Sequence, residues 1–224
     1  MSKIYANPFN WGEPVKGNHY VQRPEHQTAL LALLEKQTHI LLAGKRGTGK
    51  TSLLKTILDK HTTPSIHLDL RFIVSREQLF ELILKALATS FPMIDIDAKL
   101  QSLGANTQNA SLINIFDLWY EMVKGSNNKF IMVWDEFQHL AKFKENIFEE
   151  LRLSLNGRRG ITHVFVSHRG DILQDAFGKK SKTFFQNQEF YELENLEQKA
   201  CTRYLTQRFR RMGLSDFDLP DAVY

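Results

Sequence analysis

The chain has 224 residues, of which 42% are hydrophobic and 24% are charged, and this composition excludes a disordered or low-complexity protein. The only cysteine, Cys201, excludes an internal disulfide and favours a reducing compartment. The formal net charge of +4 gives weak support for a nucleic-acid partner.

The sequence before the first predicted helix is irregular and carries no targeting signal. Residues 1–8 lack the apolar core of a signal peptide, and no apolar run approaches the length of a membrane span. We therefore expect a cytoplasmic protein without a membrane partner. Proline and glycine punctuate residues 1–27, and apolar residues at helical spacing then predict a helix over residues 27–36. Residues 38–43 predict the first strand.

A phosphate-binding loop follows this first strand. Residues 41–51 read Leu-Leu-Ala-Gly-Lys-Arg-Gly-Thr-Gly-Lys-Thr, an apolar strand that runs into Gly-x-x-x-x-Gly-Lys-Thr and then into a predicted helix over residues 51–60. The glycines let the backbone amides point inward at phosphate groups, and the helix N-terminus adds its dipole. We expect Lys50 to bridge the β- and γ-phosphates and the Thr51 hydroxyl to bind Mg²⁺.

The whole loop is expected to contact the nucleotide, and a glycine-rich turn that binds nothing is the alternative. The expected nucleotide-binding residues are Gly44, Lys45, Arg46, Gly47, Thr48, Gly49, Lys50, Thr51 and Ser52.

The middle of the chain predicts a strand and two helices. Residues 65–70 alternate between apolar and polar side chains and predict the next strand. Ser75 and Gln78 form a capping-box pattern that starts a helix. Residues 93–110 are rich in turn-forming and polar residues and are expected to form a surface loop. Residues 111–124 predict an amphipathic helix.

A second apolar strand ends in two carboxylates. Residues 130–134 are continuously apolar, which is typical of a strand covered on both faces, and Asp135 and Glu136 follow directly. We expect this strand to lie beside the phosphate loop, because ligands bind at the carboxyl ends of parallel strands. Asp135 would hold the Mg²⁺ shell and Glu136 would polarise the attacking water. A buried strand that meets a polar turn is the alternative.

The next predicted strand also ends in polar groups. A helix is predicted over residues 145–155 and a strand over residues 162–166, after which come Ser167 and His168. Either side chain is expected to hydrogen-bond the γ-phosphate or the lytic water, so the catalytic set comprises Glu136, Lys50, His168 and Ser167. A strand end without ligand contact is the alternative. His168 is not expected to bind a metal, because no cluster of ligands has the required spacing.

The last elements are a short helix over residues 171–177, a strand over residues 190–193 and a helix over residues 197–212. Strands that alternate with helices predict an α/β fold, a P-loop parallel sheet with helices on both faces. We divide the chain into a P-loop core over residues 1–195 and the start of a helical lid over residues 196–224. The chain stops shortly after the last helix, so we expect the lid to be incomplete.

With these motifs, the chain resembles the archaeal-type ATPases of the AAA+ and STAND group of P-loop NTPases, relatives of the origin-recognition ATPases. The phosphate loop and the pair Asp135-Glu136 match residue by residue. The segment Tyr-Val-Gln-Arg-Pro-Glu at residues 20–25 is similar to the family segment that wraps the adenine, which makes Val21 and Arg23 candidates for base contacts.

The resemblance extends to the C-terminal half of the chain. Residues 166–168 are similar to the sensor strand of the family, and residues 204–209 are similar to its first lid helix. The resemblance implies an AAA+ (ASCE) fold, with ATP or ADP as the nucleotide and Mg²⁺ as the metal.

One stretch departs from the family pattern. Residues 178–187 contain three lysines and no arginine, where the family often places an arginine that activates a neighbouring subunit. A lysine lacks the forked geometry of a guanidinium. Activation within a ring is therefore in doubt, the oligomeric state is open, and Arg158 or Arg159 would be the first alternative source of such an arginine.

Three functions are compatible with these motifs. The leading one is a Mg²⁺-dependent ATPase whose hydrolysis drives a conformational switch. The second is a DNA-associated module of mobile-element, replication or defence type, in which nucleotide gates binding; a protein partner is also open. The third, a small-molecule kinase, lacks an acceptor-binding signature. The DNA hypothesis rests on the basic residues of the last helix, namely Lys199, Arg203, Arg208, Arg210 and Arg211. Such a run more often forms a solvent-exposed helix face without a nucleic-acid partner.

Overall fold

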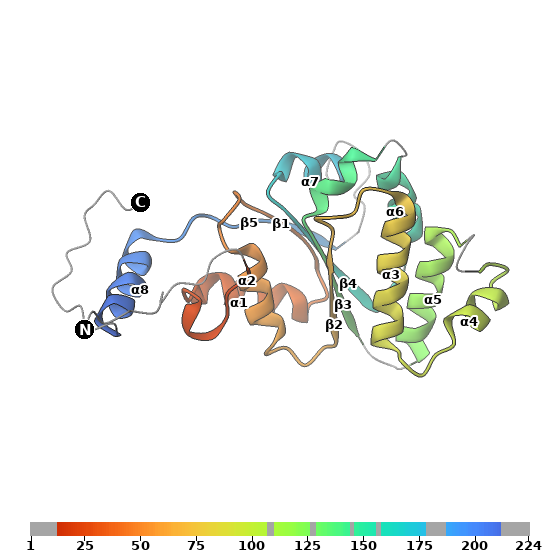
Figure 1. The fold of residues 1–224 in the computed structure, drawn as a ribbon, viewed down its shortest axis with the longest axis horizontal. Coiled ribbons are helices and arrows are strands. Elements are labelled where there is room, and N and C mark those ends of the chain that lie inside the picture. Colours follow the sequence, from red (N-terminus) through yellow and green to blue (C-terminus); the bar gives the residue numbers. More distant parts are fainter. Residues whose placement is uncertain are drawn as a thin grey trace, which may run out of the picture.

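The protein is an α/β structure built on one parallel sheet (Figure 1). The computed structural model describes residues 13–106, 110–125, 129–143, 146–155, 158–177 and 187–211. Within these ranges the sheet has five strands in the order β2-β3-β4-β1-β5. The strands are β1 His39–Ala43, β2 Ser65–Asp69, β3 Phe130–Asp135, β4 Ile161–Ser167 and β5 Gln188–Glu192.

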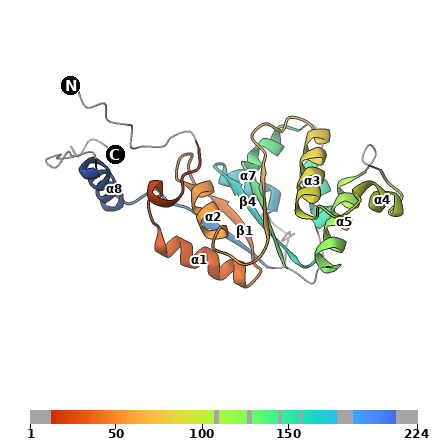
Figure 2. The same ribbon diagram turned by 60° about the horizontal axis from the view of Figure 1, so that its bottom comes forward.

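Helices cover both faces of the sheet, and one helix lies beyond its end. Figure 2 shows α1 and α2 on one side of the strands, and α8 apart from the sheet, at the end opposite α4 and α5. The helices are α1 Pro24–Glu35, α2 Lys50–Leu58, α3 Arg76–Ser90, α4 Ile96–Ser102, α5 Leu112–Gly125, α6 Ile147–Leu155, α7 Gly170–Phe177 and α8 Gln198–Arg211, with 3₁₀ turns η1 Gly17–His19 and η2 Phe137–Lys142. None of the helices in the described ranges combines the length and the apolar composition needed to cross a membrane.

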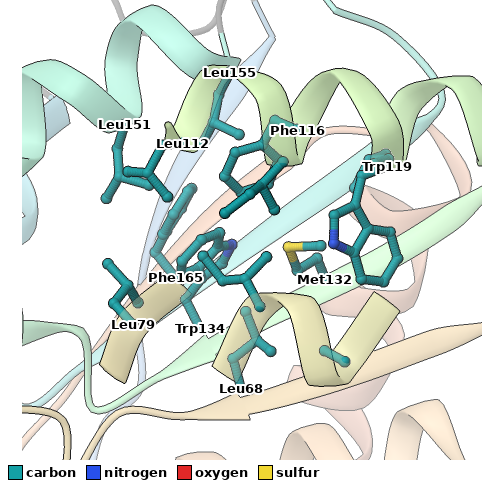
Figure 3. Packing of buried hydrophobic residues seen from close by; sticks show 14 of the residues in the cluster. Leu68, Leu79, Leu112, Phe116, Trp119, Met132, Trp134, Leu151, Leu155 and Phe165 are labelled. Atoms are coloured by element: carbon teal, nitrogen blue, oxygen red, sulfur yellow. The ribbon is translucent and has the colours of Figure 1, made fainter. Parts of the chain in front are cut away.

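The alternation of strand residues divides the core into two clusters. Met132 and Trp134 of β3 pack with α3 and α5 on one face (Figure 3), whereas Ile131 and Val133 pack with α1 and α2 on the other. A strand that is buried on both faces explains the continuous apolar run from residue 130 to 134. The parallel sheet with helices on both faces confirms the predicted fold class.

Most predicted elements are observed within about two residues of their expected bounds. Helix α1 begins earlier than predicted, because Pro24 occupies its first turn rather than a preceding loop. The surface loop predicted over residues 93–110 was wrong in part, since α4 lies within it. Asp95 caps α4 by accepting a hydrogen bond from the Ala98 amide at 3.0 Å, and Leu100 is fully buried. A single buried leucine in a polar stretch does not produce the helical spacing of apolar residues from which a helix could be predicted.

The acidic strand ends beside the phosphate loop without being the neighbour of β1 in the sheet. Strand β3 does not pair with β1, because β4 lies between them and pairs with both. The carboxyl ends of all three strands still meet at one edge of the sheet, since the pairing is parallel throughout. The acidic pair therefore reaches the phosphate loop across β4.

Two histidines are packed against each other on β1 and β4. The His163 amide donates to His39 Nδ1 at 3.0 Å, and the two rings stack with centroids 5.6 Å apart. His163 Nδ1 accepts from the Trp134 indole N–H at 3.2 Å, and its Nε2 lies 3.1 Å from the Tyr120 hydroxyl. Burial lowers the pKa of His39 to about 4 and the pKa of His163 well below its ordinary value. Both rings are therefore neutral in the folded protein near pH 7.

This pair should make the protein sensitive to mild acid. Between pH 6.5 and pH 4 a histidine in the unfolded chain is largely protonated, whereas His39 in the folded protein is largely neutral. The unfolded state therefore binds more protons, and stability falls as pH falls. From pH 7 to pH 5, His39 alone should cost on the order of 2 kcal/mol of unfolding free energy. His39→Asn should lose that much less over the same interval in urea titrations, with His61→Asn as the matched control. An equal loss in wild type and His39→Asn would contradict this account.

Candidate nucleotide site

The loop between β1 and α2 has the backbone of a phosphate cradle. Gly47 and Gly49 have φ of +84° and +86°, a left-handed conformation that side chains rarely adopt, and Gly49 is the N-cap of α2. Gly44 is required for a different reason, because a Cβ there would lie 2.5 Å from the carbonyl oxygen of Leu193, just after β5. The loop therefore packs closely against Leu193, the residue that follows β5. The N-terminus of α2, at the end of the loop, is the kind of site that binds anions.

Lys50 is folded back over this loop. Its Nζ donates to the carbonyl oxygens of Gly44 at 2.7 Å and Lys45 at 2.9 Å. Burial lowers the pKa of Lys50, while the nearby carboxylates of Glu136 and Asp135 oppose that shift. The ammonium group thus lies in the centre of the cradle with two acceptors that a phosphate group would replace.

Thr51 and Asp135 meet at the edge of the loop, as the predicted metal site requires. The Thr51 hydroxyl donates to Asp135 Oδ2 at 2.7 Å, and His67 Nε2 lies 3.0 Å from the same oxygen. Burial would raise the pKa of Asp135, but the hydrogen bonds from His67 and Thr51 hold it below its ordinary value. An alcohol oxygen and an ionised carboxylate are ligands that Mg²⁺ prefers, so these residues fit the metal.

His67 was missed by the sequence reasoning. It lies on β2, whose register with β3 pairs Asp69 with Asp135, so the site depends on which strands are neighbours. The alternating pattern of residues 65–70 predicts the strand but gives no sign of that pairing. No group of three or more metal-ligating side chains occurs in the described part of the chain, so any metal would depend on Thr51, Asp135 and a bound ligand.

Glu136 stands where the chain leaves β3, in a strained conformation. Its φ of 58° is left-handed, which is uncommon for a residue other than glycine. Its Oε2 accepts a hydrogen bond from the Gln138 side-chain amide and lies 3.3 Å from Nδ1 of His168. The Ser167 hydroxyl donates to Gln138 Oε1 at 2.8 Å, so the polar ends of β3 and β4 form one network. Sequence reasoning named all of these except Gln138, a buried glutamine in η2.

Two adjoining cavities open beside the loop. One of about 480 Å³ is lined by residues 46–52 and Glu136, by residues 13–15, 19–21 and 23 of the N-terminal segment, and by Leu196 and Tyr204. A smaller one of about 290 Å³ contains His67 and Asp135, and shares Thr51 and Glu136 with the first. Among the expected nucleotide contacts, Gly44 and Lys45 do not line the larger cavity. His168 is connected to the site through Glu136, and Ser167 through Gln138 and Glu136.

Val21 and Arg23 both line the larger cavity, and the Arg23 side chain also hydrogen-bonds to backbone carbonyls. Arg23 is buried, and its Nη1 donates to the Thr48 carbonyl at 2.9 Å. Its Nη2 donates to the carbonyls of Glu194 at 2.6 Å and Asn195 at 3.2 Å. Arg23 therefore ties the phosphate loop to the segment that leads from β5 to α8.

Helix α8 is joined to the N-terminal segment by a second arginine. Arg208 is buried, donates to the carbonyl of Asn18, and lies over the ring of Tyr204 at 5.2 Å. The basic residues of this helix are therefore not one solvated face. The exposed members are Lys199, Arg203, Arg210 and Arg211.

Arg158 lies far from the site. It precedes β4 at the amino ends of the strands, where it pairs with Asp117 and lies over the ring of Tyr120. The phosphate loop lies at the carboxyl ends of the parallel strands, so Arg158 and Arg159 are on the opposite edge of their own sheet. Residues 178–186, which hold the lysines of the departing stretch, lie outside the described ranges.

A family model described as an AAA domain matches residues 33–174 of the chain. No curated protein matches the sequence. Among solved structures, the fold is similar to the Walker-type ATPase PABY2304 of Pyrococcus abyssi, at 17% identity and a TM-score of 0.70, over 96% of this chain and 64% of that one.

Two further archaeal structures share the fold. Cdc6p from Pyrobaculum aerophilum matches at 16% identity and a TM-score of 0.60, over 91% of this chain and 53% of that one. The ORC2 protein of Aeropyrum pernix, with ADPNP and ADP, matches at 17% identity and a TM-score of 0.57, over 100% and 56%. The chain thus spans between 53% and 64% of the length of these three structures.

The contacts of Arg23 lead to a prediction about its role in ligand binding. Arg23→Lys removes hydrogen bonds to the Thr48 carbonyl in the loop and to the Glu194 carbonyl before α8, so binding of ATP and of inorganic tripolyphosphate should weaken by a similar factor, about tenfold. Titration calorimetry with both ligands measures this, and Lys60→Ala at the exposed end of α2 is the control. Weaker binding of ATP alone would instead show that Arg23 contacts the base.

Proposed function

The chain belongs to the AAA domain family, and from this membership and the site geometry we propose that it binds ATP with Mg²⁺ and hydrolyses it as a nucleotide-driven switch. The observation that carries the proposal is the direct contact of Thr51 with Asp135, with Glu136 as the next residue. A phosphate loop, a metal-holding acid and a second carboxylate are the parts that phosphoanhydride hydrolysis needs.

Each part has a distinct role in the proposed reaction. Lys50 would exchange the loop carbonyls for β- and γ-phosphate oxygens, and the loop amides would bind the remaining phosphate charge. Thr51 and Asp135 would hold Mg²⁺, which supplies charge neutralisation at the phosphates when bound. Glu136 would accept a proton from the attacking water, in line with the bond to the leaving group.

The wall of the larger cavity suggests where the base lies. Val21 and Tyr20 come from the N-terminal segment, Leu196 comes from the segment that leads into α8, and Tyr204 comes from α8 itself. Apolar and aromatic surfaces from two sides are typical of a pocket for a planar ring. A nucleotide would therefore bridge the P-loop core of residues 1–195 and the proposed lid of residues 196–224, which is how hydrolysis could move α8.

A DNA-associated role is the second candidate, and exposed Lys199, Arg203, Arg210 and Arg211 on α8 favour it. In that case nucleotide would gate binding rather than drive turnover. Affinity for a DNA duplex that falls steeply with added salt, and that differs between the ATP and ADP forms, would support it. Equal binding in both nucleotide states would leave no role for gating.

Lys50→Ala should abolish stabilisation by nucleotide. Lys50 is the side-chain cation at the centre of the cradle, and ATP at about 100 times its dissociation constant should stabilise the wild type by about 2.7 kcal/mol. Thermal unfolding with and without MgATP measures the shift, and Lys60→Ala should keep it. A shift in Lys50→Ala equal to that of the wild type would remove the phosphate-loop assignment.

Glu136→Gln should separate binding from hydrolysis. The change keeps the size of the side chain and removes its charge, so ATP should bind as tightly or more tightly, while phosphate release should fall at least about 10²-fold. Asp135→Asn should instead weaken the part of the affinity that depends on Mg²⁺. Glu81→Gln, exposed on α3, is the matched control. Turnover at the wild-type rate in Glu136→Gln would show that another group activates the water.

A further inference from the structure

Gln138 connects the two strand ends that carry the proposed catalytic groups. Its side chain is only 7% exposed and lies between Ser167, which is 1% exposed, and the carboxylate of Glu136. A buried amide in an apolar core is costly unless both of its ends are hydrogen-bonded, and here both are. The side chain is therefore held from two sides in one orientation.

The direction of this network follows from the chemistry of its ends. An ionised carboxylate only accepts hydrogen bonds, so the NH₂ group of Gln138 must face Glu136. Its carbonyl oxygen then faces Ser167, whose hydroxyl donates to it at 2.8 Å and also lies 3.0 Å from a second acceptor, the carbonyl oxygen of Arg169. The Ser167 oxygen in turn accepts from the Arg169 amide at 2.9 Å. Through its bond to Gln138, the Ser167 hydroxyl helps to hold Gln138, and Gln138 in turn holds the carboxylate of Glu136.

The other end of the network lies beside the end of β1, the strand that leads into the phosphate loop. Ser167 is paired in the sheet with Ala43, the residue immediately before Gly44 of the loop. A change at Ser167 would be transmitted to Glu136 through Gln138.

We propose that Gln138 is a positioning residue, which orients the Glu136 carboxylate and makes that orientation depend on the hydroxyl of Ser167. This inference rests on the proposed ATPase function and adds to it a residue outside the phosphate loop and the pair Asp135-Glu136. Gln138 does not touch the nucleotide cavity, so its effect on the reaction is exerted through Glu136.

The test is a double-mutant cycle on turnover. Gln138→Met keeps the volume of the side chain and removes both hydrogen bonds, and Ser167→Ala removes the donor at the other end. Each should lower kcat about tenfold, the scale of one hydrogen bond to a charged group, with KM for MgATP and stabilisation by ADP unchanged. The double variant should be no slower than the slower single variant, because both substitutions break one network.

Controls separate positioning from folding. Gln101→Met, at an exposed position of α4, should leave kcat unchanged. If Gln138→Met does not fold, Gln138→Asn keeps the amide but is too short to bridge both groups, and it should give the same loss of kcat. A wild-type kcat in a folded Gln138 variant, or a double variant slowed by the product of the single effects, would overturn the inference alone. A wild type without ATP hydrolysis would overturn the proposed function as well.

Discussion

The hydrogen bond between Thr51 and Asp135 is the contact on which the site depends. Thr51 lies in the first turn of α2, the helix after β1, and Asp135 ends β3, which is separated from β1 by β4. The bond is possible because Asp135 projects to the same face as Ile131 and Val133, the face that α2 covers. Parallel pairing brings the carboxyl ends of three strands to one edge, so a single side-chain contact closes the site across the middle strand.

That arrangement explains why Glu136 is strained. The chain turns directly after Asp135, so that the carboxylates of Asp135 and Glu136 both lie at the carboxyl edge of the sheet. The left-handed conformation of Glu136 makes this turn at a cost of about 1–3 kcal/mol. The Glu136 amide donates to Asp135 Oδ1 at 2.9 Å, and Gln138 and His168 hold its carboxylate. The hydrogen bonds around the turn therefore offset the strain, and they place the proposed base beside Asp135, the proposed metal-holding acid.

The sequence predicts the parts of the site that are local and misses those that depend on packing. The loop from Gly44 to Thr51 and the pair Asp135-Glu136 can be predicted from the sequence, because each is a short motif that lies at the end of a predicted strand. The contacts of His67 and Gln138 cannot be predicted from the sequence, because they depend on which strands are neighbours and on side chains that are far apart in the chain. The fold class was predictable from alternating strands and helices. The order of the strands, with β4 beside β1, was not.

Arg23 shows how the segments outside the sheet are coupled to the phosphate loop. It contacts the carbonyl of Thr48 inside the loop and the carbonyls of Glu194 and Asn195 before α8. Gly44 packs directly under Leu193 of the same segment, so the loop cannot shift without disturbing the start of α8. Arg208 completes the connection by binding Asn18 from the other end of the helix. Because a nucleotide would touch the loop and this segment together, its binding energy can be transferred to α8 through backbone contacts.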